Sequence, residues 1–484
     1  MFWLAIDVED QADMAKKAEQ RLVVGELIAP EIEELLAAAD PDGARETMLD
    51  LLDPELADVI EALDEEPRAV AFAVLPAERA AAVLDLLPSD VQEELVERLS
   101  PDHTAAVVSE MPVDDRVELV GDLSDELAEP LLESLEASER AETERQLEYP
   151  EGSVGRLMTA DYLTVRPEWT VERALGHLRE RGAEAETLDT LYVVDGAGRL
   201  TDQVRLKTLV LAEPGQVCDA LREGHVVSVK VEDDQEQVVY FSERYDTPVL
   251  PVVDGENVLV GIVTFDDVAD VAEEETTEDV QKMGAVQALE HPYLSASLME
   301  LVKKRGVWLA ILFVAGIVTV FAMGQFHEQL QDEKLAILAL FIPLIIASGG
   351  NSGTQAASLI IRAMAIGEVD LRDAPRVARR ELASGLLLGS VLGVLGMAVT
   401  CVVGLWLFRE AAHPMGEALH AGFAIGTAIV GVVVTGTLIG GLLPFALKGL
   451  GADPATCSTP FVTTLVDVAG LVIYFLTASL ILRM

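Results

Sequence analysis

The C-terminal part of the chain alternates between long uncharged runs and short charged segments. Five runs, each longer than 20 residues, are free of Asp, Glu, Lys and Arg apart from one position. A spanning helix needs about 20 predominantly apolar residues, so each run is long enough to cross a bilayer. The pattern predicts five membrane-spanning helices, at residues 306–326, 335–361, 382–408, 418–447 and 454–482.

Residues 50–147 repeat a much shorter unit with a period near 12, as in "LPAERAAAVLDLL" (75–87) and "LPSDVQEELVERL" (87–99). Proline suits the first turn of a helix, and Ser or Asp suits the position where a helix starts. Each unit is therefore predicted to form about two helical turns and a corner. Stacking such units buries the apolar side chains that one unit cannot bury alone, so the pattern predicts a small helical solenoid.

From about residue 155 the pattern changes to short β-rich runs that alternate with helical segments. The chain passes twice through this order, and each pass contains a "VVD-G" turn, at 193–196 and 252–255. The two passes resemble a tandem pair of cystathionine-β-synthase-type (CBS) regulatory modules. Asp202 departs from that pattern, because the first module would usually have glycine there, and ATP binding at the CBS pair stays open. Residues 273–305 then indicate a connecting helix that runs to the membrane.

Charge divides the chain at about residue 300. The formal net charge is −49, yet residues 301–484 hold 11 acidic and 12 basic residues. Of the totals of 83 acidic and 34 basic residues, 72 and 22 therefore fall in residues 1–300. Such a surface repels nucleic acid and attracts cations. A solvated acidic surface explains most of this charge, and a minority of the carboxylates is available for specific cation sites.

Basic residues fall on one side of the predicted spans. "KKR" (303–305) precedes the first span and "RDAPRVARR" (372–380) separates the second from the third, whereas the loops at 327–334 and 409–417 have no basic excess. The positive-inside rule then places the N-terminal part in the cytoplasm and Met484 outside. The start of the chain lacks the basic region of a signal peptide. The cysteines Cys218, Cys401 and Cys457 show neither metal nor disulfide spacing.

Polar residues interrupt two of the predicted spans. Asp467 lies near the middle of the last one, where a carboxylate costs roughly 2.5–3.5 kcal/mol on insertion scales. The second span contains "GGNSGTQ" (349–355), and polar or irregular backbone at membrane depth is tolerated only inside protein or beside water. Interhelical hydrogen bonding explains any one of these residues. A permeation path explains the cluster together with Asp467 better.

The order of these parts resembles the MgtE family of magnesium transporters. The specific matches are "GGNSGTQ" (349–355), "DPATCSTP" (453–460) and "TTLVDVAGLVIYF" (463–475), and the likeness covers nearly the whole chain. The resemblance implies a multi-domain membrane protein with a cytosolic α-helical solenoid, an α/β tandem CBS pair, a connecting helix and a five-helix transmembrane domain. The implied divisions are an N-terminal extension (1–30), the solenoid (31–150), the CBS pair (151–272), the connecting helix (273–304) and the transmembrane domain (305–484).

The resemblance also implies a homodimeric Mg²⁺ channel of the inner cell membrane, with a pore at the dimer axis built chiefly from the second and fifth spans. Asp467 is the implied cation ligand of that pore, one from each subunit. Because Mg²⁺ dehydrates reluctantly, we expect the two carboxylates to hold a largely hydrated ion. The implied pore lining is Gly350, Asn351, Thr464 and Val468. Whether Mn²⁺ or Co²⁺ also passes is open.

A cytosolic Mg²⁺ sensor that holds the pore shut is the third implication of the resemblance. Its matching positions are Asp114, Glu118, Asp267, Asp270, Glu275, Glu278, Asp279 and Asp453. The run "DDVADVAEEETTED" (266–279) would repel itself unless cations were present. A solvated acidic helix explains any single one of these residues equally well.

Three rival functions compete with the channel. "HEQLQ" (327–331) lacks the second histidine of the HExxH zinc motif, so a metalloenzyme is rejected and no enzymatic activity is expected. An exporter of divalent cations coupled to protons or sodium stays open, since Asp467 could carry a proton. A nucleotide sensor with a simple membrane anchor would need neither Asp467 nor the polar segment "GGNSGTQ" (349–355).

Overall fold

The computed structural model describes residues 25, 27–289, 293, 296–326, 336–407, 414–456 and 459–482. The chain forms two compact units, residues 1–273 and 274–484. The predicted N-terminal extension at 1–30 lies outside the described residues except at 25 and 27–30. The loop at 327–334 with its "HEQLQ" motif, most of the loop at 409–417, Cys457 and Met484 also lie outside them.

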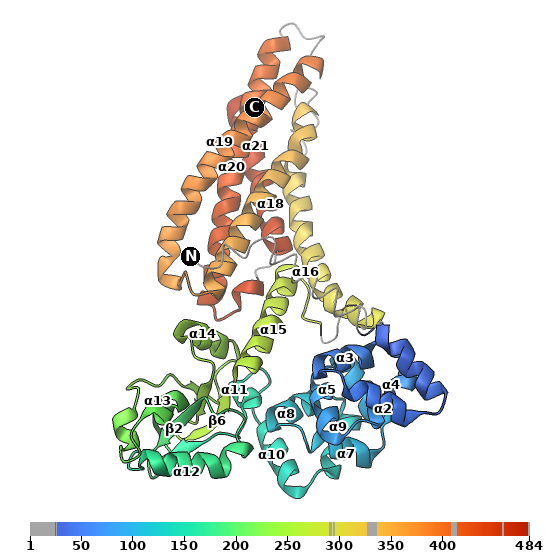
Figure 1. Cartoon of the computed structure of the whole chain (residues 1–484). Coiled ribbons are helices and arrows are strands. Elements are labelled where there is room, and N and C mark those ends of the chain that lie inside the picture. The colour runs from blue at the N-terminus through green and yellow to red at the C-terminus, as the bar shows by residue number, and fades with distance from the viewer. Residues whose placement is uncertain are drawn as a thin grey trace. The chain divides into compact units, whose positions relative to one another are not determined.

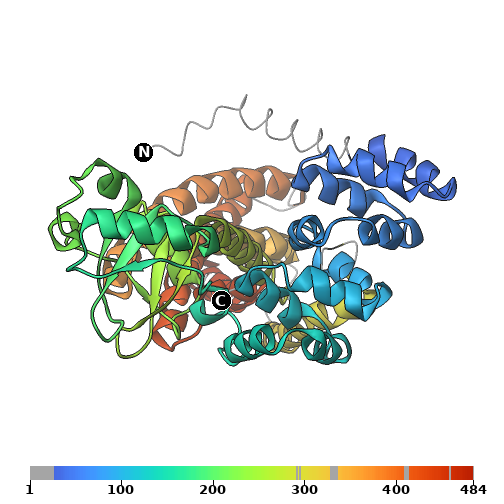
Figure 2. The same cartoon turned by 60° about the horizontal axis from the view of Figure 1, so that its bottom comes forward.

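The first unit begins with a stack of short helices, coloured blue to cyan in Figures 1 and 2. Ser100 begins one of them as predicted, because its hydroxyl accepts a hydrogen bond from the backbone N–H of His103. Met48, Leu56, Phe72 and Leu95 are fully buried between the helices, which confirms the solenoid. The helices are α2 (Pro41–Leu49), α3 (Asp53–Ala62), α4 (Glu65–Ala73), α5 (Ala77–Asp85), α6 (Ser89–Arg98), α7 (Pro101–Val108), α8 (Val113–Asp122), α9 (Asp125–Ser134) and α10 (Ala137–Leu147).

Two three-stranded sheets of identical topology follow in the same unit. In each sheet the first strand runs parallel to the second, and the second pairs with the third in antiparallel fashion. The strands are β1 (Thr164–Val165), β2 (Thr190–Val194), β3 (Leu200–Arg205), β4 (Val229–Lys230), β5 (Leu250–Val253) and β6 (Leu259–Val263). The helices are α11 (Val154–Leu157), α12 (Val171–Arg181), η1 (Gly182–Glu184), α13 (Leu206–Leu211), η2 (Cys218–Leu221) and α14 (Glu236–Tyr245).

The two predicted "VVD-G" turns close these sheets in the same way. One carboxylate oxygen of Asp195 accepts the backbone N–H groups of Ala197 and Arg199, at 2.8 and 2.9 Å. Asp254 makes the equivalent pair of hydrogen bonds in the second module. Asp202, the departure from the usual glycine, is buried and accepts the backbone N–H groups of Gln203 and Gly224. Its carboxylate therefore ties the first module to the segment that leads into the second.

The predicted connecting helix is two helices rather than one. Helix α15 (Phe265–Met283) begins in the first unit and ends in the second, and α16 starts only at Leu298. Ala285 has a positive φ of 58°, a left-handed conformation that a regular helix does not contain. The backbone N–H of Val286 then bonds back to the carbonyl of Gln281, which closes the end of α15.

The second unit contains long apolar helices. They are α16 (Leu298–Gln325), α18 (Ala336–Ala365), α19 (Ala374–Leu407), α20 (Pro414–Gly449) and α21 (Thr459–Leu482), with the short helices η3 (Leu371–Asp373) and η4 (Pro454–Thr456) between them. Within the described residues, α16, α19, α20 and α21 are long and apolar enough to span a membrane. The count of five predicted spans is therefore approximate, and α18 is a fifth long helix of 30 residues.

Glycines let three of these helices approach closely. A Cβ on Gly393 of α19 would lie 2.6 Å from the carbonyl oxygen of Gly426 on α20, and one on Gly389 would lie 3.1 Å from Val430 Cα. A Cβ on Gly353 of α18 would likewise lie 3.0 Å from the carbonyl oxygen of Gly436 on α20. Backbones pack this closely only where small residues face each other. The glycine spacing thus serves packing within one chain.

Candidate functional site

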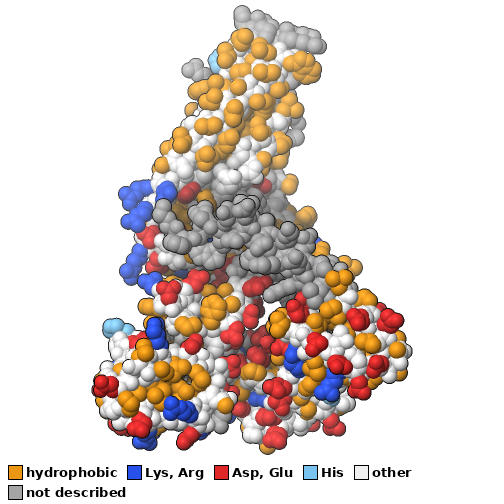
Figure 3. Space-filling view, viewed as in Figure 1, with side chains coloured by type: hydrophobic (Ala, Val, Ile, Leu, Met, Phe, Trp, Pro, Cys, Tyr) orange, Lys and Arg blue, Asp and Glu red, His pale blue; other side chains and the backbone are white. Residues whose placement is uncertain are grey.

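Three carboxylates from two distant parts of the sequence meet in the first unit. Asp114 and Asp115 open α8, and Asp267 lies in the first turn of α15. Each offers one oxygen, and these three oxygens lie within 4.8 Å of one another. Figure 3 shows Asp and Glu side chains gathered where the helical and the α/β parts of this unit meet. We call Asp114, Asp115 and Asp267 the acidic cluster.

Local structure fixes two members of the acidic cluster. The Asp267 carboxylate accepts two hydrogen bonds from Thr264, one from the backbone N–H at 2.9 Å and one from the hydroxyl at 2.8 Å. The Asp267 carboxylate therefore caps the start of α15. Asp114 is only 7% exposed, and its Oδ1 is buried with no hydrogen-bond partner among the described residues. A buried oxygen without a donor is costly, and a bound cation would satisfy it.

Burial and mutual repulsion perturb the titration of the acidic cluster. Burial, and then the charges of Asp267 and Glu186, raise the pKa of Asp114 to about 8. Burial, and then the charge of Asp85, raise the pKa of Asp115 to about 9. Burial raises the pKa of Asp267 to about 6. Without a cation Asp114 and Asp115 thus retain protons near neutral pH, the expected behaviour of like charges that share a buried site.

A second row of acids surrounds the acidic cluster. Asp85 ends α5 and remains exposed to solvent, but partial desolvation by its neighbours, followed by the charges of Asp270 and Asp266, raises its pKa to about 6. Desolvation, and then the charge of Asp266, also raise the pKa of Asp270 and the pKa of Glu186. Such a set of oxygens matches the ligand preference of hard cations like Mg²⁺.

The predicted sensor positions therefore divide between the two units. Asp114 and Asp267 meet directly. The charge of Asp270 raises the pKa of Asp85, and the charge of Glu118 raises the pKa of Asp115, so Asp270 and Glu118 lie close to the acidic cluster. Glu275 lies on the part of α15 that belongs to the second unit. Sequence reasoning missed Asp85, Asp115, Asp266 and Glu186. Asp266 lies in the acidic run at 266–279 and Asp115 in the pair "DD" at 114–115, but neither pattern indicated which carboxylates face inward.

The other predicted sensor positions form a separate group at the end of α15, in the second unit. Burial, and then the charge of Asp453, raise the pKa of Asp279. The ammonium of Lys282, which sequence reasoning missed, lies 2.8 Å from Glu278 Oε1 and 2.9 Å from Asp453 Oδ2. Met283 packs against an apolar cluster that includes Ala455 of η4 and Val462 near the start of α21. The last turn of α15 is therefore held against the segment that leads into α21.

The predicted pore residues lie on two helices that pack together, α18 and α21. A Cβ on Gly350 would lie 3.3 Å from Thr463, and one on Gly353 would lie 3.1 Å from Val462. Asn351 is exposed on α18, while Thr464, Asp467 and Val468 are partly exposed on α21. The Thr464 hydroxyl donates to the carbonyl of Pro460, at 2.8 Å. The GGN segment and the helix that carries Asp467 are thus neighbours within one chain.

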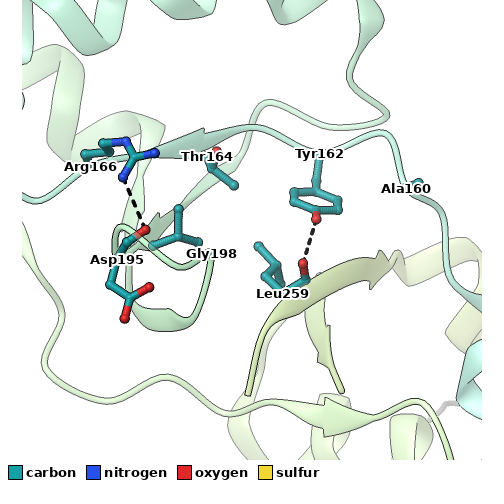
Figure 4. Close-up of a pocket in the computed structure, with 8 residues that line it drawn as sticks. Ala160, Tyr162, Thr164, Arg166, Asp195, Gly198 and Leu259 are labelled. Carbon is teal, nitrogen blue, oxygen red and sulfur yellow. Dashed lines mark hydrogen bonds between the residues drawn. The ribbon is translucent and has the colours of Figure 1, made fainter. Parts of the chain in front are cut away.

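A cavity of about 430 Å³ opens beside the first CBS module. Tyr162, Thr164 and Arg166 line it, together with Asp195 and with Leu259 of the second module (Figure 4). The Arg166 guanidinium donates to the Asp195 carbonyl at 3.3 Å, and the Tyr162 hydroxyl donates to the Leu259 carbonyl at 2.9 Å. Small-molecule sites have volumes of roughly 300–1,000 Å³, so the cavity could hold such a ligand.

Family models match three successive parts of the chain. The MgtE intracellular N domain matches residues 51–152, the CBS domain matches residues 154–215 and 219–274, and MgtE, described as a divalent cation transporter, matches residues 342–477. These matches define the class as a divalent cation transporter with an intracellular N domain and CBS domains.

Similar proteins agree with that class. The magnesium transporter MgtE of Thermus thermophilus is 42% identical over 344 residues, which cover 71% of this chain and 73% of that protein. The magnesium transporter MgtE of Enterococcus faecalis is 32% identical over 347 residues, 72% of this chain and 73% of that protein. The chain therefore belongs to the MgtE family of magnesium transporters.

One similar solved structure is the cytosolic domain of the Mg²⁺ channel MgtE in complex with ATP. It is 36% identical, covers 50% of this chain and 99% of that chain, and has a TM-score of 0.48.

Proposed function

We propose that this protein is a Mg²⁺ channel of the cell membrane that closes when cytosolic Mg²⁺ binds its acidic soluble part. The observation that carries this proposal is the acidic cluster, since three carboxylate oxygens meet within 4.8 Å although Asp267 lies 152 residues beyond Asp115 in the sequence. Such an arrangement is unfavourable without a cation and favourable with one. Binding of Mg²⁺ therefore joins α8 to the start of α15.

The proposed pathway follows α18 and α21 at the axis of a homodimer. Asp467 supplies one carboxylate from each subunit and holds a largely hydrated Mg²⁺ ion, because this ion gives up its water reluctantly. Gly350, Asn351, Thr464 and Val468 line the same path, and the Gly350 contact with Thr463 supports their common location. In this arrangement the N-terminal part faces the cytoplasm and the C-terminus faces outside.

The proposed gate is the last turn of α15. Asp279, Glu278 and Asp453 form a second Mg²⁺ site there, and Met283 contacts the start of α21. A ligand shifts a conformational equilibrium only by its differential affinity for the two states. The closed state must therefore bind more Mg²⁺ than the open one, so that a Mg²⁺-rich cytosol closes its own entry route.

ATP is a second proposed ligand, at the cavity beside the first CBS module. Arg166 lines this cavity and is the group that a phosphate would contact, whereas Asp202 binds backbone N–H groups. Arg166→Gln should weaken ATP binding, measured by isothermal titration calorimetry of the full chain.

Mg²⁺ uptake into proteoliposomes tests the proposed function. The wild-type chain should admit Mg²⁺ without a proton or sodium gradient, and Asp467→Asn should remove at least nine tenths of this flux. Glu368→Gln, at an exposed position outside the proposed pore and sensor, serves as the control and should keep the wild-type flux. Uptake that requires a proton or sodium gradient would instead support the coupled exporter, and wild-type flux through Asp467→Asn would contradict the pore assignment.

A further inference from the structure

Four arginines are concentrated where α19 begins. Arg372, Arg376, Arg379 and Arg380 fall within nine residues and are all exposed, and they are a third of the 12 basic residues in 301–484. Figure 3 shows blue side chains gathered at the end of the second unit where α19 starts. In a chain with a net charge of −49, such a concentration of positive charge is a local exception.

The packing of α19 fixes the direction in which these arginines point. Val377 is buried in a cluster with Met364 of α18 and Phe445 of α20, so this face of the first turn is turned inward. Arg376, Arg379 and Arg380 are three and four residues apart and therefore share another face. Arg376 pairs with Asp373 at 2.9 Å, but its side chain remains 82% exposed, and exposed pairs contribute little.

The arginine face of α19 continues as an exposed apolar face. Leu387 and Val394 lie about three and five helical turns beyond Arg376, and they are 70% and 63% exposed. Near the other end of the helix Trp406 is 71% exposed. Arginine and tryptophan at opposite ends of an exposed apolar helix mark the two membrane surfaces. The rise from Arg380 to Trp406 is about 39 Å, close to the ~40–45 Å of a bilayer with its headgroups.

We propose that Arg372, Arg376, Arg379 and Arg380 form a docking surface for anionic phospholipid headgroups. The guanidinium group is suited to phosphate, because it offers several donors in a fixed fork. The acidic soluble part of the chain is the rival occupant. Lipid is favoured because the arginine face leads directly into the exposed apolar face of the same helix. The docked headgroups would fix the depth of α19 and, through Val377, of α18 and α20.

Lipid binding to the full chain in detergent tests this docking surface. Short-chain phosphatidylglycerol and phosphatidylcholine are titrated onto wild type and onto the variant Arg376→Gln/Arg379→Gln/Arg380→Gln, with native mass spectrometry as the readout. A basic residue near an anionic lipid surface changes affinity about 5-fold, so three should weaken phosphatidylglycerol binding by on the order of 100-fold. Phosphatidylcholine binding should be unchanged.

Two controls accompany the glutamine variant. Arg45→Gln/Arg179→Gln/Arg199→Gln removes the same charge from exposed sites of the first unit and should bind phosphatidylglycerol like wild type. The lysine triple variant at 376, 379 and 380 keeps the charge and should retain most of the preference for phosphatidylglycerol. Equal phosphatidylglycerol affinity of wild type and the glutamine variant would overturn the proposal. If that equality came with a lower melting temperature, the arginines would be assigned to the acidic soluble part instead.

Discussion

Lowering the pH should weaken Mg²⁺ binding at the acidic cluster steeply. Mg²⁺ binds deprotonated carboxylates, and the pKa values of Asp114 and Asp115 are raised by burial to about 8 and about 9. Both carboxyls therefore hold a proton at pH 7, and each proton that Mg²⁺ displaces makes binding tenfold weaker per pH unit. Between pH 7.5 and 6.5 the dissociation constant should rise about 10-fold for one displaced proton and about 100-fold for two.

The same shifts determine how stability depends on pH without Mg²⁺. The carboxyl pKa values are higher in the folded than in the unfolded chain, where they are about 3.9. The folded state binds more protons between about pH 4 and pH 8–9, so its stability falls as pH rises through that window. From pH 5 to 8 the loss is up to about 4 kcal/mol per carboxyl, at 1.36 kcal/mol per pH unit. Asp115→Asn should therefore stabilise the Mg²⁺-free protein at pH 8 and also weaken its Mg²⁺ binding.

Calorimetry of the full chain in detergent measures both effects. Mg²⁺ titrations in two buffers with different ionisation enthalpies give the number of protons released for each ion bound, which should be between one and two at pH 7. Asp102→Asn, at an exposed position of α7, is the control and should leave both affinity and melting temperature unchanged. The absence of proton release, together with equal affinity at pH 6.5 and 7.5, would refute the reasoning.

Two further predictions concern the second unit. Gly436→Ala should destabilise the protein by about 1–3 kcal/mol, because the new methyl group would collide with the Gly349 carbonyl and with Ser352 Oγ at 2.8 Å. Thermal unfolding in detergent measures this loss, and Gly316→Ala, which has open space around it, should be nearly neutral. Lys282→Gln removes the ammonium between Glu278 and Asp453, so amide exchange at the end of α15 should accelerate in Mg²⁺-free buffer and slow again with Mg²⁺. Lys282→Arg should behave like wild type, and unchanged exchange in the glutamine variant would contradict this role.

Local sequence patterns predicted the elements of the fold because their causes are local. Ser100 before a proline begins α7, and Asp195 and Asp254 close the two sheet turns through their own backbone neighbours. The prediction of a single connecting helix overlooked the signal of a break between α15 and α16, because Gly284 and Pro292 lie between these helices in the sequence. Ala285 adopts a left-handed conformation there that alanine seldom takes, so nothing in its residue type announces the end of a helix.

The candidate site was only partly predictable, because its parts meet through tertiary packing. The "VDDRVE" segment and the run at 266–279 were visible as acidic stretches, yet only the fold brings Asp114 and Asp267 together. Asp85 lies in "LDLL" and resembles any solvated acid of the solenoid. Lys282 resembled an isolated basic residue after an acidic run, and the sequence did not show that Glu278 and Asp453 are its ion-pair partners.

Patch recording of the full chain, with Mg²⁺ stepped on the cytosolic face from micromolar to ~10 mM, tests the central claim most directly. This interval includes the ~10⁻⁴–10⁻³ M range of weak oxygen-ligand sites. The account predicts that wild type closes as Mg²⁺ rises. Asp114→Asn/Asp115→Asn/Asp267→Asn should close only at a concentration at least tenfold higher, with unchanged single-channel conductance. A triple variant that closes at the wild-type concentration would contradict the account.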